Sequence, residues 1–276
     1  MEAKLITYEQ KRYEMYEQYK KYTLIGYLTL IFLIGFIFLI MASNIKREYD
    51  KFIKSTVIDS LIKDMYEESM YEPNQMMNID YIRSLSMYRR PDRWFGEDYF
   101  SGIYKGVRFA CSEITLQERR EQRDSKGNRR VYYVNYFNGR FYSFTFEKQF
   151  EERLQVIERR SNGMVSGRMQ KFDTESIEFN KTFNTYATDQ HYVFYQLTPV
   201  IQLNLLQFEN MHRGTVQVLY QGNTLDVAVN DSINTLHLDI KTPLTMENLQ
   251  PIVQDIQMPA AIINEFNLDS DKFKNI

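Results

Sequence analysis

The 276-residue chain lacks most of the residues from which covalent or metal-based frameworks are built. It has one cysteine, Cys111, which excludes an intrachain disulfide and a zinc site made of cysteines. The histidines His191, His212 and His237 are too far apart for the short spacings typical of paired metal ligands. We therefore predict no metal site and no cofactor.

Sequence motifs of enzymes are also missing. The chain contains no glycine-rich phosphate loop and no HExxH, GxSxG or CxxC motif. A net charge of −2, from 34 basic and 36 acidic residues, argues against a dedicated nucleic-acid-binding protein. A hydrophobic content of 43% argues against a disordered chain. We predict a folded protein without identifiable catalytic residues, and we do not expect nucleic acid among its partners.

Charge is absent from one long stretch, Tyr22 to Ile45. Its apolar part, Leu24 to Ala42, would form a helix of roughly 29 Å, about the thickness of the hydrocarbon core of a bilayer. A continuous helix satisfies its own backbone hydrogen bonds in lipid. We therefore predict an uncleaved, single-pass transmembrane helix over residues 23–43, which makes the lipid bilayer a partner of this segment.

The residues that flank this segment do not orient it. Five lysines and arginines lie within about 20 residues on each side, so the positive-inside rule gives no preference. They are Lys4, Lys11, Arg12, Lys20 and Lys21 before the segment, and Lys46, Arg47, Lys51, Lys54 and Lys63 after it.

Helical patterns continue on both sides of the apolar segment. Residues 1–22 predict a polar, tyrosine-rich helix, which either lies on the membrane surface or simply extends the span. Residues 44–72 place apolar side chains at helical intervals and predict an amphipathic connecting helix, which Pro73 and Asn74 end. We expect its apolar stripe to dock on the rest of the protein, and self-association is the alternative.

Residues 73–276 predict a soluble α+β domain with a mixed, largely antiparallel sheet. The most specific short signal is Asn138-Gly139, which predicts a hairpin between strands 131–137 and 140–146. Thr198-Pro199 predicts a helix start. Further predictions are a helix or strand at 79–88, strands at 100–106, 107–116, 154–158, 183–187 and 236–240, a second hairpin at 221–223, and two short helices within 245–268 separated by prolines.

The densest polar cluster lies between Arg89 and Asp98. Arginines in such a cluster can grip a phosphate or carboxylate while the single tryptophan stacks on the ligand. The alternative is an internal ion-pair network that fixes a turn, because the opposite charges are balanced. The candidate binding residues are Arg90, Asp92, Arg93, Trp94, Glu97 and Asp98.

A second candidate surface is a basic stretch around Ser125–Asn128. The sequence Ser125–Asn128 predicts the tip of a hairpin. Its cations could contact anionic lipid headgroups or another polyanion such as RNA, or the tip could be a solvated loop. The residues are Arg119, Arg120, Arg123, Lys126, Arg129 and Arg130.

The stretch from Arg90 to Glu113 and three later segments contain motifs that resemble those of one protein family. The motifs are Arg90-Pro-Asp-Arg-Trp-Phe-Gly-Glu-Asp98 with Gly102, Gly106 and Phe109-Ala-Cys-Ser-Glu113, then Tyr186–Gln190, Tyr195–Pro199 and Ile262–Leu268. Together they resemble an uncharacterised bacterial family, the domain of unknown function DUF3137, over about residues 45–270.

The resemblance implies an N-terminal membrane anchor and an α+β domain. It implies no activity, so no catalytic residue is carried over. Members of the family often have two membrane spans arranged as a hairpin, which keeps the domain in the cytoplasm. This sequence departs from that pattern because it shows a single apolar span.

These observations lead to one functional hypothesis and two alternatives. We expect a membrane-anchored bacterial protein whose α+β domain, placed in the cytoplasm, binds a protein or ligand near the membrane. The first alternative is a membrane-associated, hydrolase-like enzyme that uses clustered carboxylates, and the second is a sensor of anionic lipids. The carboxylates are Asp92, Glu97, Asp98 and Glu113.

Overall fold

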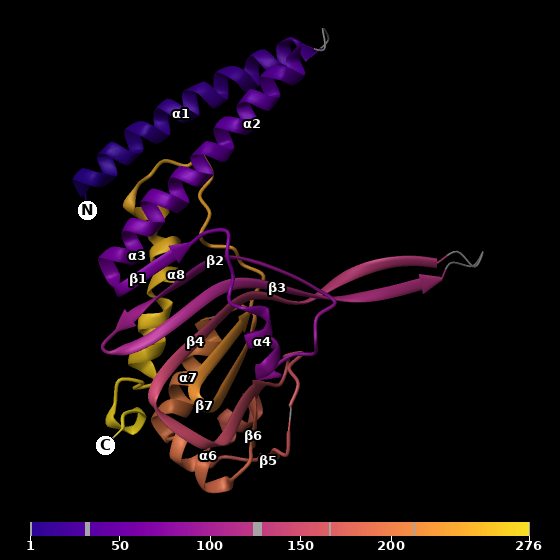
Figure 1. Ribbon diagram of the computed structural model, residues 1–276, viewed down its shortest axis with the longest axis vertical. Helices are drawn as coiled ribbons and strands as arrows, with labels where there is room; N and C mark the ends of the chain where they lie inside the picture. The colour runs from indigo at the N-terminus through magenta and orange to yellow at the C-terminus, as the bar shows by residue number, and fades with distance from the viewer. Residues whose placement is uncertain (1, 31–33, 124–128, 166, 212, 276) are drawn as a thin grey trace. The chain divides into compact units, whose positions relative to one another are not determined.

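The computed structural model describes residues 2–30, 34–123, 129–165, 167–211 and 213–275 (Figure 1). Residues 1–65 and 235–258 form one compact unit, and residues 66–234 and 259–276 form a second. The helices are α1 (Glu2–Leu28), α2 (Gly35–Phe52), the π-helix η2 (Ile53–Ile58), α3 (Asp59–Met65), α4 (Ile79–Leu85), α5 (Ile177–Thr182), α6 (Gln190–Gln196), α7 (Pro199–Met211), α8 (Met246–Glu265) and the 3₁₀ helix η3 (Asp271–Phe273). The strands are β1 (Glu67–Glu72), β2 (Arg93–Tyr104), β3 (Val107–Arg123), β4 (Arg129–Glu158), β5 (Gln170–Phe172), β6 (Phe183–Ala187) and β7 (Thr215–Asn230).

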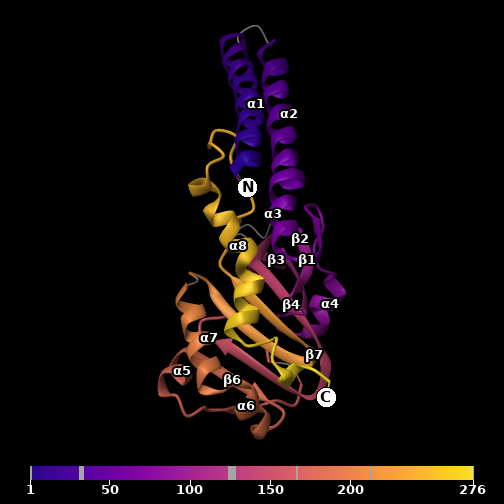
Figure 2. The same ribbon diagram turned by 90° about the vertical axis from the view of Figure 1, so that its left-hand side faces the viewer.

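The helices α1 and α2 form an antiparallel hairpin in the first unit (Figure 2). A Cβ atom on Gly35 would lie 2.3 Å from the carbonyl oxygen of Gly26, so the glycines let the two backbones approach closely. The rings of Tyr22 and Phe38 stack across the pair with their centroids 6.2 Å apart. The apolar segment is therefore folded back on itself.

This hairpin corrects the prediction of one continuous helix over residues 23–43. The first helix ends at Leu28 and the second begins at Gly35, while residues 31–33 lie outside the described part of the chain. Within the described residues, no helix combines the length and the uninterrupted apolar character needed to cross a bilayer. The pattern of apolar residues did not reveal the break, because Gly26 and Gly35 are themselves compatible with a membrane helix.

The connecting helix predicted over residues 44–72 is shorter than expected. The chain is helical from α2 through η2 and α3 and leaves the helix at Met65. Residues 67–72 form the edge strand β1, which pairs antiparallel with β2. Strand pairing overrides the helical pattern there, because β2 offers those residues backbone hydrogen bonds.

A buried arginine holds α1 within the first unit. Arg12 is 4% exposed and makes two hydrogen bonds, of 2.9 and 2.8 Å, to the carboxylate of Glu9. Its Nη1 donates to the carbonyl of Ile240 at 2.6 Å, and Glu9 accepts from the backbone of Leu244 at 2.6 Å. Residues 236–240 form a loop, which these contacts attach to α1. The strand predicted there is therefore wrong.

The second unit is built on one antiparallel sheet with the order β1-β2-β3-β4-β6-β5, and β7 also pairs with β4. The helix α4 packs on one face through Ile82 and Leu85, against Phe137 and Phe141. The opposite face of the sheet buries a second cluster of aromatic side chains. Its members are Tyr66, Phe100, Phe109 and Phe144. The predicted α+β class with a largely antiparallel sheet is confirmed.

The hairpin predicted at Asn138-Gly139 is wrong, because β4 runs through both residues without a turn. The glycine serves another purpose: a Cβ on Gly139 would lie 2.0 Å from the carbonyl oxygen of Val229 in β7. Glycine inside a strand often marks such a close approach of another backbone. The chain instead reverses between Arg123 and Arg129, which are paired across β3 and β4.

Two other breaks predicted from glycine and proline are also absent. The strand β7 continues through Gln221–Asn223, where Gly222 has a positive φ of 58° and the pairing with β4 is irregular. The helix α8 continues through Pro251 and Pro259. Strand β6 over 183–187 and helix α7 from Pro199 agree with the predictions, and 79–88 contains a helix rather than a strand.

Candidate functional site

A basic pocket of about 560 Å³ lies at the end of α4 in the second unit. Three arginines line it, and Asp80 is the carboxylate among its lining residues. The lining residues are Asp80, Arg83, Ser84, Ser86, Tyr88, Arg89, Arg90, Met164 and Val165. Positive charge in an open cavity favours an anionic ligand, since guanidinium groups match carboxylate and phosphate oxygens.

The caps of helix α4 fix the position of Arg83, which lies on its last turn and lines the pocket. The side chain of Asn78 accepts from the backbone of Asp80 at 2.8 Å and caps the start of the helix. Ser86 ends the helix in a left-handed conformation with φ 53°. Arg83, on the last turn, lies 4.3 Å over the ring of Trp94 and bonds Asp80 at 3.2 Å.

The second arginine is held by aromatic and acidic groups. Arg89 lies 4.6 Å over the ring of Tyr136 and forms an ion pair with Glu118. The hydroxyl of Tyr136 donates to the carbonyl of Arg89 at 2.7 Å, and burial raises the pKa of that hydroxyl. The phenol therefore stays neutral and keeps this hydrogen bond at physiological pH.

Arg90 differs from its two neighbours. It is exposed, and no described residue forms a hydrogen bond or an ion pair with it. Its guanidinium is therefore available to a ligand, whereas those of Arg83 and Arg89 are oriented by partners. The far wall is fixed by the backbone of Met164, which donates to the carbonyl of Met87 at 2.8 Å.

The predicted cluster of binding residues is dispersed by the strand β2. Of these candidates only Arg90 lines the pocket, while the ring of Trp94 contacts the lining residue Arg83. Asp92 accepts from the backbone of Arg119 at 2.7 Å, and Arg93 lies 3.5 Å over the ring of Tyr133. Sequence reasoning missed Arg83, Ser84, Ser86, Met164 and Val165, because only the fold brings residues 164–165 beside the end of α4.

The acidic part of the predicted cluster lies elsewhere. Carboxylate oxygens of Glu97, Asp98 and Glu113 lie within 4.8 Å of one another, a spacing that a cation could use. Asp98 is fully buried and accepts from the hydroxyl of Tyr71 at 2.5 Å. The buried guanidinium of Arg140 lies 4.0 Å from Glu113 and offsets part of the negative charge.

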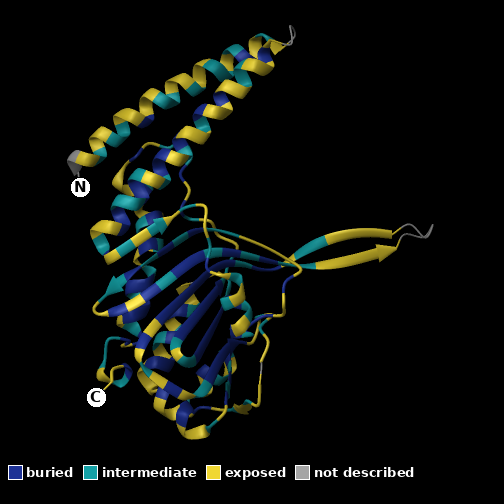
Figure 3. Ribbon diagram, viewed as in Figure 1, coloured by how far each residue is buried: buried dark blue, intermediate teal, exposed yellow. Residues whose placement is uncertain are grey.

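The predicted basic tip lies on a two-stranded ribbon formed by the ends of β3 and β4 (Figure 3). Glu121 forms ion pairs with Arg119 and Arg129, and Glu118 with Arg120. Arg123 and Arg130 form no ion pair with a described residue, and Lys126 lies outside the described residues. Carboxylates on the ribbon therefore neutralise part of the predicted positive patch.

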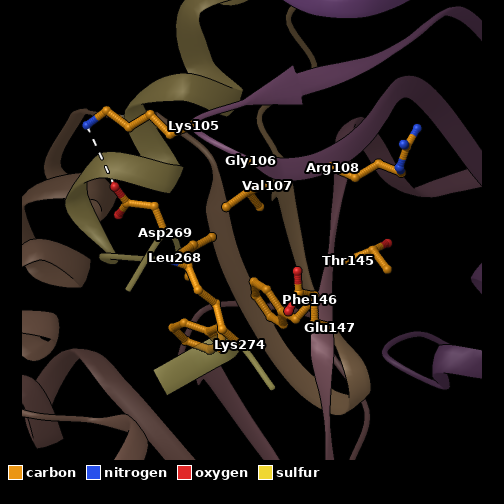
Figure 4. Close-up of a pocket in the computed structure, with 11 residues that line it drawn as sticks. Lys105, Gly106, Val107, Arg108, Thr145, Phe146, Glu147, Leu268, Asp269 and Lys274 are labelled. Atoms are coloured by element: carbon orange, nitrogen blue, oxygen red, sulfur yellow. Dashed lines mark ion pairs between the residues drawn. The ribbon is translucent and has the colours of Figure 1, made fainter. Parts of the chain in front are cut away.

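A second polar pocket, of about 410 Å³, is lined by three cationic and two acidic side chains, and its cations have carboxylate partners (Figure 4). Lys105 lies 3.9 Å from Asp269 on one side of it, and Arg108 extends away from that pair. Lys274 pairs outside the pocket with Asp271 at 3.3 Å. Such compensation makes this pocket less suited to a charged ligand than the basic pocket.

The cysteine and two of the histidines considered in the sequence lie outside the basic pocket or outside the described residues. Cys111 is buried and takes no part in a disulfide bond. His237 lies 4.0 Å from Asp50, and His212 is outside the described residues. These positions do not bring Cys111 and His237 into the basic pocket.

Comparison with known proteins supports the family resemblance. Residues 135–268 match the model of a family described as "Protein of unknown function (DUF3137)". The resemblance is thereby confirmed over this range, which is shorter than the predicted 45–270 and excludes the first motif. The comparison with curated proteins gave no match.

One solved structure is similar to the chain. It is the crystal structure of the mycobacterial trehalose monomycolate transport factor A, TtfA, with 7% sequence identity and a TM-score of 0.40. The match covers 72% of this chain and 92% of that one. At this identity and score, the similarity says nothing about activity.

Proposed function

We propose, starting from the resemblance to a family without an assigned activity, that this protein is a membrane-tethered module that binds an anionic ligand. The observation that carries the proposal is the convergence of Arg83, Arg89 and Arg90 on one open pocket. The ligand carries a phosphate or carboxylate group. The exposed side chains of Met164 and Val165 add an apolar wall for the part of the ligand next to that group.

The first prediction concerns Arg90. Arg90→Ala should weaken binding of inorganic phosphate or a short dicarboxylate about tenfold or more, because a charge-assisted hydrogen bond contributes about 1.5–3 kcal/mol. Isothermal titration calorimetry on the full chain measures the effect. Arg93→Ala is the matched control, since Arg93 stacks on Tyr133 and does not line the pocket. Equal weakening by both variants would place the anion outside this pocket.

The tether in this proposal is the apolar end of the α1–α2 hairpin. Leu24, Leu28, Phe36 and Ile37 are exposed there, in a segment without charged residues. The charge-free parts of the two helices measure roughly 10 and 16 Å, about half the thickness of the hydrocarbon core. An exposed apolar surface of this kind favours insertion into one leaflet, in place of the single-pass span that apolar content alone predicts.

A hairpin also changes the argument about orientation. Both ends of an inserted hairpin return to the same side, so the five cations before it and the five after it add together. Clustered lysines and arginines favour the cytoplasmic side. We therefore place the α+β unit in the cytoplasm, at the inner face of the cell membrane.

The second prediction tests the tether. Ile37→Asp should abolish most membrane binding, because aspartate in the apolar region costs about 3 kcal/mol relative to isoleucine. Sedimentation of the full chain with phosphatidylglycerol-containing vesicles measures it. Ile6→Asp is the control, since Ile6 is also exposed, at 72% against 58% for Ile37, but lies in the charged half of α1. Equal vesicle binding by all three proteins would exclude this tether, and termini labelled on opposite sides would restore a single-pass span.

The two alternative functions receive less support from the described contacts. A hydrolase needs its carboxylates to face a substrate cavity, and Asp92 lies apart from Glu97, Asp98 and Glu113 as a cap for Arg119. A lipid sensor needs several uncompensated cations, and ion pairing of Arg119, Arg120 and Arg129 leaves only Arg123 and Arg130 among the described arginines of the ribbon. We therefore favour the anion-binding module.

A further inference from the structure

Helix α7 presents apolar side chains in two directions. Ile201, Leu205 and Phe208 are buried in the second unit. Leu203, which is 55% exposed, and Leu206 instead line a groove of about 510 Å³. A helix with apolar residues on both faces normally has both faces covered, so this outer face offers a surface for a partner.

The groove has a defined shape. Pro199, Gln202, Leu203 and Leu206 follow one another at intervals of three, one and three residues, which places them on one side of α7. The other lining residues include Phe194 in α6, Leu197 at its C-terminal cap, and residues at the start of α5. The lining residues are Glu175, Ser176, Glu178, Phe194, Leu197, Pro199, Gln202, Leu203 and Leu206.

Negative charge lies at one end of this groove. Glu175 and Glu178 are exposed, and neither carboxylate forms a hydrogen bond or an ion pair with a described residue. This distinguishes them from Glu209 on α7, which pairs with Arg160 at 2.8 Å. The uncompensated carboxylates favour a partner with basic residues beside its apolar face.

One residue that lines the groove also carries a buried polar atom without a hydrogen-bond partner among the described residues. Gln202 is 7% exposed, and its Nε2 donates to the carbonyl of Leu197 at 2.8 Å. Its Oε1 is buried and has no hydrogen-bond partner among the described residues. An unsatisfied buried acceptor costs free energy, so this part of α7 is not optimised for stability alone.

We propose that the groove between α5, α6 and α7 binds an amphipathic helix of a partner protein, with leucine-like residues facing α7 and lysine or arginine facing Glu175 and Glu178. Recognition of an amphipathic helix by an apolar groove is a common mode of peptide binding. This site is separate in sequence and composition from the basic pocket and does not depend on its ligand.

A labelled 18-residue peptide of leucine and lysine, with leucine at helical intervals, tests the proposal. The full chain is held in zwitterionic nanodiscs or free in buffer, whichever keeps it monodisperse, and protein-free samples serve as blanks. We expect saturable binding by fluorescence anisotropy and photo-cross-links from the peptide to residues 194–206. A peptide with glutamate in place of lysine should bind at least about tenfold more weakly, because its charge is opposite.

Paired variants locate the contact. Leu203→Asp should weaken binding about tenfold or more through loss of apolar burial, while Ile233→Asp, at another exposed apolar position, should not. Glu178→Lys should weaken it about three- to fivefold, while Glu151→Lys should not. Equal binding of both peptides, or equal effects within either pair, would overturn the proposal. A dimer of the full chain that Leu203→Asp dissociates would also overturn it and identify a second copy as the occupant.

Discussion

Gly139→Ala should destabilise the second unit by about 3 kcal/mol or more, or prevent it from folding. The added Cβ would lie 2.0 Å from the carbonyl oxygen of Val229 and 3.1 Å from the Cα of Asn230. Both are backbone positions, so relief would require β4 and β7 to separate. Urea unfolding followed by circular dichroism measures the loss.

The surrounding hydrogen bonds explain why β7 cannot yield easily at this point. The backbone of Asn138 donates to the side chain of Asn230 at 2.9 Å, and its carbonyl accepts from Ser232 at 2.8 Å. Gly106→Ala is the control. Nothing lies within 4 Å of a Cβ at Gly106, so only its positive φ of 78° opposes the change, at about 1–2 kcal/mol. A smaller loss for Gly139→Ala than for Gly106→Ala would refute the close contact.

Asp226→Asn should stabilise the protein by up to about 3 kcal/mol at pH 7.5 and change little at pH 4. Asp226 is fully buried on β7, and burial raises the pKa of its carboxyl group to about 6 from 3.8. Hydrogen bonds oppose that shift: Tyr81 donates at 2.6 Å and Thr224 at 2.8 Å. The amide of asparagine keeps one acceptor and carries no charge, so it avoids the cost of ionisation in this site.

The direction of the pH effect follows from the raised pKa. Below about pH 4 the carboxyl group is protonated in both the folded and the unfolded chain, and its contribution to stability is fully present. That contribution is lost as the pH rises through about 6, because the unfolded chain ionises more readily. The difference in unfolding free energy between Asp226→Asn and the unchanged protein should therefore grow from pH 4 to pH 7.5.

An exposed aspartate provides the comparison. Asp271→Asn changes a side chain that is 94% exposed, so its effect on the free energy of unfolding should be small. Thermal unfolding at several pH values, with all three proteins in the same buffers, measures both variants. A constant difference between Asp226→Asn and the unchanged protein across this range would show that Asp226 does not titrate there.

The sequence was sufficient to predict secondary structure at positions where neighbouring residues alone determine it. Proline at the first position of a helix costs no hydrogen bond, so Thr198-Pro199 marked the start of α7. The strands predicted at 107–116 and 183–187 lie in β3 and β6, and the grouping of strands indicated the α+β class.

The wrong predictions at glycine residues show which structural features depend on tertiary packing. At Asn138-Gly139 the sequence has the composition of a tight turn, yet β4 continues because the residue faces the backbone of Val229. In the first unit, Gly26 and Gly35 allow two helices to approach where apolar content alone indicated a single helix. A glycine permits a turn, a bend or a close contact, and only the packing around it selects one.

The candidate sites divide in the same way. The sequence named Arg90 as a candidate binding residue because arginines were clustered with an aromatic side chain. It could not identify Arg83 or Met164 as its neighbours, nor the groove on α7, because these residues meet only after α4, β4 and the connecting segments have packed. Composition and local spacing therefore determined which elements and charges the protein has, while contacts between distant segments decided which of them share a pocket.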